Sequence, residues 1–496
     1  MTTQTTTYST IVIGAGSGGL TVAIGLAAFG KPVALIEGGA VGGDCTNVGC
    51  IPSKTLIHEA AQRAADPATI LATVQQRRDH LRDEETAHVQ QIENLSYIHG
   101  WARFVSAKEL EVTHADGSRR RVSAANIVIA TGSRPREIEI PGLPSDRALT
   151  NESIFELKDA PRHLAIVGAG VIAMELAFAF RKLGSRVTIL TKDQRVMRRE
   201  SESTSEVLTA SLRDSAIDVR YGVTVTAYDV ESETLRLRDG SAIAGVDRVL
   251  LAIGRARNID KLGLEQIGVK FDPDTGIQVD RNGRTSIPGI YAIGDVTPTS
   301  RWTHSAGAQG RRVVQQIAFP WLPAWSAEPL YPSATFSDPE VAGVGLLPDQ
   351  IARRYHPGLI KTLRVELSST DKGYTEGLNY GFIEVYALRL TGRILGATIV
   401  GPRAAEMISF FTLAISEGVT LYRLYRLVYP YPTHSTGIQT IADTFMRETL
   451  PHIPAELGAV LCYGLATIWG RLRGGSFAAI APPDRKLAAF GGWGGE

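Results

Sequence analysis

The stretch Thr10-Ile-Val-Ile-Gly14-Ala-Gly16-Ser-Gly-Gly19 determines the fold expected for the first part of the chain. Its opening residues predict a short buried strand, and its spaced glycines predict a turn that runs into a helix over 20–29. A second strand follows over 32–36, and Glu37 comes directly after it. This is the context of a dinucleotide-binding fingerprint, in which glycine N–H groups approach a pyrophosphate and the carboxylate accepts hydrogen bonds from a ribose.

A second copy of this unit begins 154 positions after the first. The strand Leu164-Ala-Ile-Val-Gly168 leads through Gly170 and Ala173 into a helix, and the strand Arg186-Val-Thr-Ile-Leu190 follows. We therefore predict an α/β protein with two Rossmann-like nucleotide-binding domains.

The two copies differ at the position after the second strand. Gly14 to Glu37 and Gly168 to Thr191 both span 23 positions, so Thr191 stands where the first copy has its carboxylate. Lys192 and Arg195 follow closely. A small residue beside cations accommodates the 2′-phosphate of NADP, whereas a carboxylate prefers the ribose of NAD. The second copy thus favours NADPH, with NADH as the alternative and solvated loop charges as the plainer interpretation of Lys192 and Arg195.

Further strands indicate how the domains are arranged. Apolar strands that end in glycine turns occur over 126–132, 248–254 and 289–295. The third of these lies after the second unit but suits the first, so we expect the first domain to be discontinuous and to enclose the second. From about Pro329 the strand-like segments 381–386 and 394–400 and the helical segment 406–417 predict a separate α+β domain.

Composition limits the class of function. A chain of 496 residues predicts about three domains at ~150 residues each, and 44% hydrophobic with 21% charged residues indicates a folded globular protein. Lys and Arg number 52 against 51 Asp and Glu, which argues against nucleic acid and for a small-molecule partner. Three cysteines are too few for a secreted disulfide scaffold, and no basic signal-peptide region precedes Lys31. We expect a cytoplasmic protein.

The segment Gly42-Gly-Asp-Cys45-Thr-Asn-Val-Gly-Cys50-Ile-Pro-Ser-Lys54 is the most specific motif. Two cysteines five positions apart, in a glycine-rich turn that runs into a helix led by Pro52, can approach within disulfide distance if the turn is tight. The start of a helix also favours the thiolate form. No further cysteine or histidine is spaced nearby for a metal site, and buried structural thiols are the remaining alternative.

With these motifs the sequence, over roughly residues 8–450, resembles the pyridine nucleotide-disulfide oxidoreductase family of flavoproteins. The resemblance implies that FAD binds a domain made of 1–150 and 275–328, and that NAD(P)H binds a domain of 151–274. It also implies a homodimer formed through a dimerisation domain of 329–450. The segment Tyr331 to Gly345 resembles the start of the dimerisation domain in that family. Residues 451–496 would then form a C-terminal extension.

The same resemblance implies residue roles. Cys50 would be the thiol beside the flavin, Cys45 the thiol that meets the acceptor, and Lys54 a residue near the flavin that pairs with Glu175. The position of Tyr431 would contact the acceptor. The residues expected to line FAD or NAD(P)H are Gly14, Gly16, Gly19, Glu37, Gly43, Thr131, Gly132, Gly168, Gly170, Ala173, Lys192, Gly254, Arg255, Gly294 and Asp295.

The chain departs from the family near its C-terminus. Disulfide reductases of this family carry His-Pro-Thr-x-x-Glu, whereas this chain has Tyr431-Pro-Thr-His-Ser-Thr436. A tyrosine, with a pKa near ~10, is a poor base at neutral pH. We expect His434 to point away from Tyr431 and to be a surface or packing residue.

Tyr431 and the segment Asp371-Lys-Gly-Tyr-Thr-Glu376 resemble the mercuric reductase branch. That branch, however, has a paired Cys-Cys in its tail, where this chain has only Cys462. We expect Cys462 to be a small buried residue on a helix. Its apolar segment, 457–469, should pack on the dimer, with contact to a membrane surface as the disfavoured alternative.

Three functions follow. The leading one carries electrons from NAD(P)H through FAD to a Cys45–Cys50 disulfide, and on to a small-molecule or small-thiol acceptor such as a disulfide or an Hg(II)-like ion. The alternative is a quinone or diaphorase-type reductase, which needs no histidine base. A non-catalytic redox sensor is disfavoured because both cysteines, Lys54 and Glu175 are retained.

Overall fold

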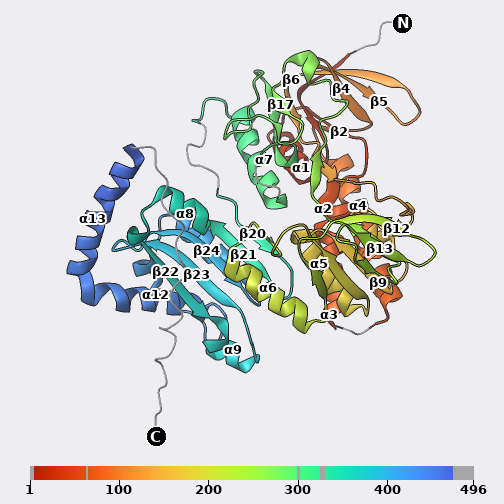
Figure 1. The fold of residues 1–496 in the computed structure, drawn as a ribbon. Coiled ribbons are helices and arrows are strands. Elements are labelled where there is room, and N and C mark those ends of the chain that lie inside the picture. Colours follow the sequence, from red (N-terminus) through yellow and green to blue (C-terminus); the bar gives the residue numbers. More distant parts are fainter. Residues whose placement is uncertain (1–4, 63–64, 299–301, 324–329, 473–496) are drawn as a thin grey trace. The chain divides into compact units, whose positions relative to one another are not determined.

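The computed structural model describes residues 5–62, 65–298, 302–323 and 330–472 (Figure 1). The chain divides into two compact units. The first comprises Met1–Arg198 and Leu212–Tyr331, and the second comprises Arg199–Ser211 and Pro332–Glu496.

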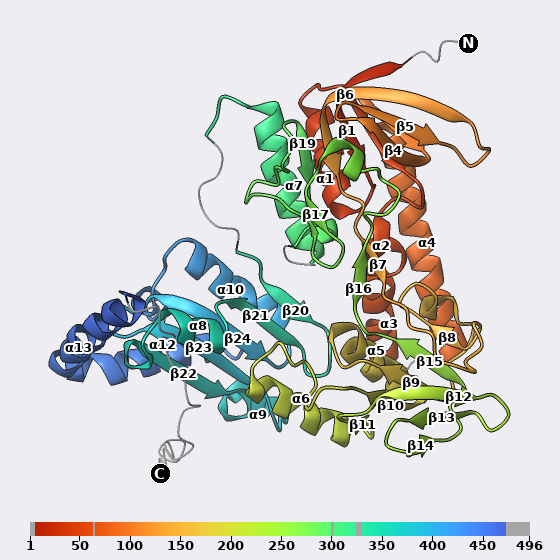
Figure 2. The same ribbon diagram turned by 45° about the horizontal axis from the view of Figure 1, so that its top comes forward.

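A seven-stranded sheet forms the base of the first unit, in the order β3-β2-β1-β6-β5-β4, with β19 pairing to β6 (Figure 2). Parallel pairing joins β2, β1, the second half of β6 and β19, as the predicted strand–helix–strand unit requires. Helices α1 and α7 pack against each other, and a Cβ atom at Gly25 of α1 would lie 3.0 Å from Val314 of α7. The bounds are β1 Thr6–Ile13, α1 Ser17–Ala28, β2 Val33–Glu37, α4 Pro67–Gln91, β3 Leu95–His99, β4 Trp101–Ser106, β5 Glu109–Thr113, β6 Arg119–Ile129, β19 Ile290–Ala292 and α7 Thr303–Ala318.

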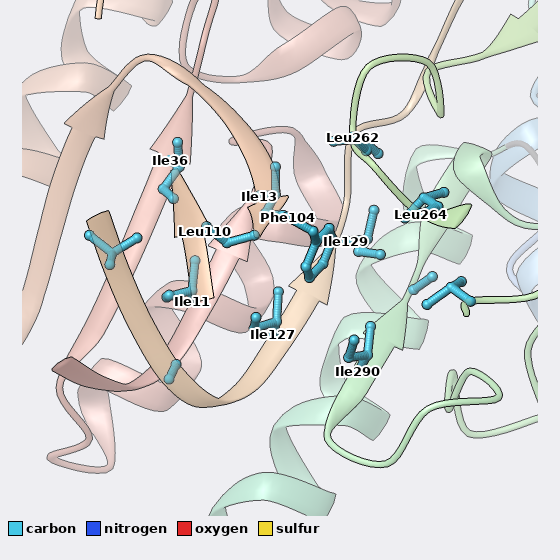
Figure 3. Packing of buried hydrophobic residues seen from close by; sticks show 14 of the residues in the cluster. Ile11, Ile13, Ile36, Phe104, Leu110, Ile127, Ile129, Leu262, Leu264 and Ile290 are labelled. Atoms are coloured by element: carbon cyan, nitrogen blue, oxygen red, sulfur yellow. The ribbon is translucent and has the colours of Figure 1, made fainter. Parts of the chain in front are cut away.

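One face of this sheet packs into a core that draws on distant parts of the chain (Figure 3). Ile127 and Phe104 from the sheet are buried together with Leu262, Leu264 and Ile290. The chain therefore returns to this core before residue 275, where the sequence predicts the return, because apolar side chains from 259 onward fill the space beside β4 and β6.

The second sheet has the order β11-β10-β9-β15-β8, and its strands are parallel. Its strand β9, helix α5 and strand β10 repeat the arrangement of β1, α1 and β2, which confirms the predicted pair of Rossmann-like folds. The bounds are β8 Ala148–Leu149, β9 His163–Val167, α5 Val171–Lys182, β10 Arg186–Leu190, β11 Asp218–Arg220, β15 Arg248–Leu251, and the small antiparallel sheet of β12 Val225–Asp229, β13 Thr234–Leu237 and β14 Ala242–Ile243.

The second unit is an antiparallel sheet, β20-β21-β24-β23-β22, with helices α10 and α12 packed against it. It confirms the predicted α+β domain. Most of helix α6 also belongs to this unit, where the Ser211 hydroxyl donates to the Asp338 carbonyl at 2.5 Å. The bounds are α6 Glu202–Asp214, β20 Ser333–Thr335, β21 Val341–Gly345, α8 Pro348–Arg354, β22 Ile360–Glu366, α9 Asp371–Thr375, β23 Phe382–Leu388, β24 Ile394–Val400, α10 Ala404–Ser416, α11 Leu421–Leu424 and α12 Thr436–Thr449.

The extension begins with helix α13, Ile453–Leu472. Two residues of one helix face hold it on the second unit: buried Glu456 pairs with Lys361 and Arg389, and the Tyr463 ring stacks on His356 at 4.6 Å. The prediction that Cys462 is buried is wrong, because its side chain leaves another face of α13 and is exposed. Among the described residues no helix has the length and apolar character needed to cross a bilayer.

Candidate functional site

The two cysteines of the first unit lie on two consecutive helices, of which the first is short. Cys45 is in the middle of α2, Gly43–Asn47, and Cys50 is the first residue of α3, Cys50–Gln62. The sequence predicts a plain turn before the helix, and the structure instead forms a five-residue helix there. Gly49 permits this, since a Cβ atom at Gly49 would lie 2.7 Å from the Asp44 carbonyl oxygen. The two free thiols lie within hydrogen-bonding reach of each other.

The two thiols differ in acidity. The pKa of Cys50 is lowered to about 6, first by a hydrogen bond from Cys45, then by the Thr303 hydroxyl and the Lys54 ammonium, against the opposing effect of burial. The same pair raises the pKa of Cys45, because that thiol donates to Cys50, is buried and faces a negative charge. These contacts favour the thiolate form at Cys50 and the thiol form at Cys45, and the position of Cys50 at the start of α3 acts in the same direction.

The predicted pair of Lys54 and Glu175 is formed. The Lys54 ammonium donates to both carboxylate oxygens of Glu175, at 2.9 and 2.7 Å, and joins α3 to α5. Glu175 is nearly buried, with a side chain 6% exposed. A buried carboxylate needs such a partner, and the pair places a cation near the Cys50 sulfur.

Thr303 is a site residue that the sequence reasoning missed. Its hydroxyl lies 3.3 Å from the Cys50 sulfur, at the first position of α7 and 253 positions away in the chain. Its distance along the chain explains the omission, since no local pattern links Thr303 to the cysteine motif.

We expect Thr303→Val to raise the pH midpoint of Cys50 ionisation by about one pH unit, because a hydrogen bond to a charged group is worth about 1.5–3 kcal/mol. Thiolate absorbance at 240 nm against pH, in the reduced protein, measures the midpoint. Ser53→Ala is the matched control, since the Ser53 hydroxyl donates to the Cys50 carbonyl and not to its sulfur. A midpoint that stays near pH 6 in Thr303→Val would contradict this assignment.

The first glycine turn has the geometry that FAD needs. Cβ atoms at Gly14 and Gly19 would lie 2.4 Å from the Ala130 oxygen and 1.9 Å from the Gly14 oxygen, so only glycine allows this close turn. Gly16, which precedes α1, meets Gly43 closely, since a Cβ atom at Gly43 would lie 2.7 Å from the Gly16 Cα. No described side chain caps this start of α1, which leaves its N–H groups for an anion.

Glu37 lies at the end of β2, as predicted. Its two carboxylate oxygens accept from the Ala15 N–H at 2.6 Å and the Gly39 N–H at 2.7 Å. These two bonds hold the carboxylate beside the glycine turn and leave lone pairs for ribose hydroxyls. The residues present therefore fit the adenosine part of FAD.

The second glycine turn matches the first. A Cβ atom at Gly168 would lie 2.3 Å from the Ala252 oxygen, whereas one at Gly170 would meet nothing within 4 Å. That open space at the start of α5 fits a pyrophosphate, and Ala173 is buried within the helix. Thr191 is buried at the strand end and Lys192 is exposed beside it.

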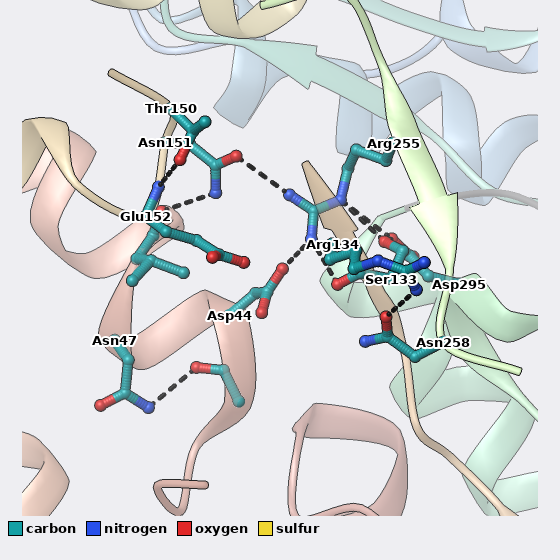
Figure 4. Close-up of polar contacts among 12 residues, drawn as sticks. Asp44, Asn47, Ser133, Arg134, Thr150, Asn151, Glu152, Arg255, Asn258 and Asp295 are labelled. Carbon is teal, nitrogen blue, oxygen red and sulfur yellow. Dashed lines mark hydrogen bonds and ion pairs between the residues drawn. The ribbon is translucent and has the colours of Figure 1, made fainter. Parts of the chain in front are cut away.

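The remaining predicted cofactor residues lie in or near two paired antiparallel strands, β7, Ser133–Pro135, and β16, Arg255–Arg257 (Figure 4). Asp295 accepts from the Ser133 hydroxyl at 2.6 Å, and Arg255 donates to the same hydroxyl at 2.7 Å. The Thr131 hydroxyl donates to the Asn258 carbonyl. Gly132, Gly254 and Gly294 have positive φ angles of 70°, 120° and 73°.

Tyr431 and His434 belong to the second unit, and each has an acidic partner there. Tyr431 is 73% exposed, and its hydrogen bond to Asp371 raises its pKa. His434 is buried, and its Nε2 lies 2.9 Å from Glu376, which also pairs with Lys372 at 2.8 Å. His434 is thus a packing residue rather than a surface residue, and no local pattern indicates its pairing with a residue 58 positions away. In the described part of the chain no three His, Cys, Asp or Glu side chains gather as a metal site.

Family models cover most of the chain. Residues 8–310 match the pyridine nucleotide-disulphide oxidoreductase model, and residues 331–442 match the dimerisation domain of that family. The second match indicates that the chain forms a homodimer.

Individual relatives agree. Dihydrolipoyl dehydrogenase from Geobacillus stearothermophilus is 34% identical over 86% of this chain and 93% of its own length. Mercuric reductase from Shigella flexneri is 33% identical over 88% of this chain and 80% of its own length. The Cu(II) complex of the HOCl-induced flavoprotein disulfide reductase RclA from Escherichia coli has a TM-score of 0.82 at 26% identity and covers 88% of this chain and 99% of that chain. The chain therefore belongs to the pyridine nucleotide-disulphide oxidoreductase family, whose enzymes use FAD and NAD(P)H.

Proposed function

We propose that this enzyme passes electrons from NADPH through FAD to a Cys45–Cys50 disulfide, and from there to a disulfide, an Hg(II)-like metal ion or a related thiol-reactive acceptor. The observation that carries the proposal is the setting of the Cys50 sulfur, which lies at the start of α3, 3.3 Å from the Thr303 hydroxyl and near the Lys54 ammonium that Glu175 holds. A structural thiol has no need of a hydroxyl and a cation beside it, whereas a thiolate does.

The cofactors and the residues around the two cysteines would have separate roles in this electron transfer. The hydride and electron transfer would be supplied by FAD and NADPH when they are bound. As two electrons enter the disulfide, its S–S bond breaks and one proton is taken up. The proton goes to Cys45, since Cys50 is kept as thiolate by Cys45, Thr303 and Lys54. Glu175 holds the Lys54 ammonium in place for that purpose.

For the nucleotides we propose FAD at the turn of Gly14, Gly16 and Gly19 and NADPH at the turn of Gly168 and Gly170. Thr191 supports NADPH over NADH, because no carboxylate stands there to repel a 2′-phosphate. Lys192 is exposed and would pair with that phosphate. The low cysteine count supports a cytoplasmic location.

We propose that Tyr431 contacts the acceptor, because it stands at the sequence position where family members that reduce disulfides have histidine. Tyr431 is held by Asp371 and its pKa is raised, so it can orient or bind an acceptor but is a poor base. An acceptor that attracts thiolates strongly, such as a soft metal ion, suits this arrangement better than one that needs proton removal from Cys45.

A quinone or diaphorase-type reductase is the second candidate, and the tyrosine at position 431, in place of a histidine base, favours it. Direct transfer from flavin to a quinone would use neither cysteine. The two candidates therefore differ in whether Cys45 is required.

Absorbance of the reduced holoenzyme tests the leading proposal. We expect NADPH to produce a long-wavelength band from the Cys50 thiolate beside the flavin. The band should persist in Cys45→Ser and be lost in Cys50→Ser, because only the lowered pKa of Cys50 keeps a thiolate at neutral pH. Cys462→Ser is the control for cysteine loss elsewhere. The same band in both active-site variants would contradict the assignment of the two cysteines.

A further inference from the structure

Arg255 holds the segment that carries Cys45. This guanidinium, on a side chain 15% exposed, forms a close ion pair with Asp44 through Nη2 (Figure 4). The same Nη2 donates to the Ser133 carbonyl at 2.7 Å, and Nε donates to the Ser133 hydroxyl at 2.7 Å. The planar fork of an arginine can serve these directions at once, which a lysine cannot do.

A second contact holds the other end of the same segment. Nη1 of Arg255 donates to the Asn151 side-chain oxygen at 3.3 Å, and the amide nitrogen of Asn151 donates to the Val48 carbonyl at 3.3 Å. Asp44 directly precedes Cys45, and Val48 follows it by three positions. Arg255 and Asn151, which contact each other, therefore grip α2 on both sides of Cys45.

The grip is anchored on the opposite side. The Ser133 hydroxyl, which accepts from Arg255, donates to Asp295 at 2.6 Å. Asp295 is followed by residues that pack in the first unit's core, such as Val296. Strands β7 and β16 pair with each other directly behind this contact, so Arg255 is fixed by its backbone as well as by its side chain.

From these contacts we infer that Arg255, with Asn151, is a positioning clamp that keeps the Cys45 sulfur facing Cys50. The inference rests on the proposed redox role of the two cysteines and deepens it. A disulfide between residues of a short segment is stable in proportion to the effective concentration of one thiol at the other. The clamp raises that concentration by preventing α2 from moving outward when the S–S bond opens.

The largest effects on the acidity of the two thiols come from residues other than Arg255. The lowered pKa of Cys50 comes from Cys45, Thr303 and Lys54, and the raised pKa of Cys45 comes from Cys50 and burial. Loss of the clamp should thus expose Cys45, and it should raise the pKa of Cys50 only through the weakened hydrogen bond from Cys45. Loss of the Thr303 hydroxyl, by contrast, should raise the pKa of Cys50 without exposing Cys45.

The test compares Arg255→Gln with the wild-type holoenzyme in two assays that need neither NADPH nor an acceptor. In the reduced protein, iodoacetamide should alkylate Cys45 about tenfold faster, as read by peptide mass spectrometry, and the pH midpoint of Cys50 alkylation should rise above about 6 because its hydrogen bond from Cys45 is weakened. In dithiothreitol buffers, a tenfold loss of effective concentration should raise the midpoint potential of the disulfide by about 30 mV.

Three variants make the result specific. Arg255→Lys keeps a cation near Asp44 without the fork and should give an intermediate rate, and Asp44→Asn provides a second variant should Arg255→Gln fail to fold. Arg134→Gln is the matched control, since Arg134 is the neighbouring arginine on β7 and bonds to Arg257, Asn258 and Asp260 rather than to the Cys45 segment.

The outcomes are distinguishable. Unchanged Cys45 alkylation and an unchanged potential in folded Arg255→Gln and Asp44→Asn would overturn the clamp and leave the proposed function standing. Equal changes in Arg134→Gln would also overturn it, because the effect would then be general loosening. A wild-type protein that forms no Cys45–Cys50 disulfide in these buffers would overturn the proposed function, and the clamp with it.

Discussion

Replacing Cys45 with serine is expected to reduce NADPH turnover with HgCl2 and with a small disulfide by ~10³-fold or more, because the loss of a nucleophile removes the covalent step itself. Oxidation of NADPH at 340 nm measures the loss with each acceptor. Cys462→Ser should keep wild-type rates, since its thiol is exposed on α13 and lies in the other unit.

A quinone acceptor belongs in the same experiment. If Cys45→Ser loses turnover with the thiol-reactive acceptors and keeps it with the quinone, the enzyme has both routes, and the thiols serve only the first. Unimpaired turnover of Cys45→Ser with every acceptor would rule out the thiol mechanism and leave the quinone reductase as the better proposal.

Glu456→Gln should lower the stability of the second unit by about 3 kcal/mol. Glu456 is 4% exposed and pairs with Lys361 at 2.9 Å and with Arg389 at 3.0 Å, and Lys361 is itself buried. Removal of one partner of a buried ion pair leaves the other charge without compensation, at a cost of about 3–5 kcal/mol. A lower urea midpoint for this unit and faster proteolysis within α13 are the expected readouts.

The control for that change is Glu448→Gln. Glu448 also faces Lys361, at 4.0 Å, but its side chain is 55% exposed, so its loss should cost less than about 1 kcal/mol. If the two variants lower the stability of the second unit equally, any negative charge near Lys361 stabilises it, and the buried contact with α13 has no special role.

The parts of the fold predicted from sequence are those set by local patterns. Strand Arg186–Leu190 and strand Ile394–Val400 have the predicted bounds, because apolar runs of this length, bounded by turns, define a buried strand. The two nucleotide turns could also be predicted from their glycines, since only glycine at position 14 tolerates the close approach of the Ala130 carbonyl.

The parts that escaped prediction depend on contacts between distant residues. The carboxylate of Glu376 reaches His434 across 58 positions, and Asn151 reaches Val48 across 103. Neither pair has a spacing that a helix or strand would impose. Cys462 was misplaced for a related reason: its apolar neighbours suggest burial, but only the contacts of Glu456 and Tyr463 determine which face of α13 is covered.

The region where relatives that reduce disulfides have a histidine base contains two side-chain pairs in this protein. Tyr431 with Asp371 and His434 with Glu376 link the short helix α9 and its end to the segment before α12 at two points. This part of the second unit is therefore held firmly although its acid–base chemistry differs from that of relatives that reduce disulfides.

Helix α6 has a consequence for synthesis of the protein. The segment 199–211 is translated in the middle of the first unit, yet it packs with the second, where Ser211 bonds to Asp338 and to Tyr380. During synthesis, more than a hundred further residues must be translated before the residues that this segment contacts, such as Asp338, are present. A gene fragment that begins at Pro332 would encode the second unit without one of its helices. The second unit is therefore not expected to fold fully when it is produced from such a fragment.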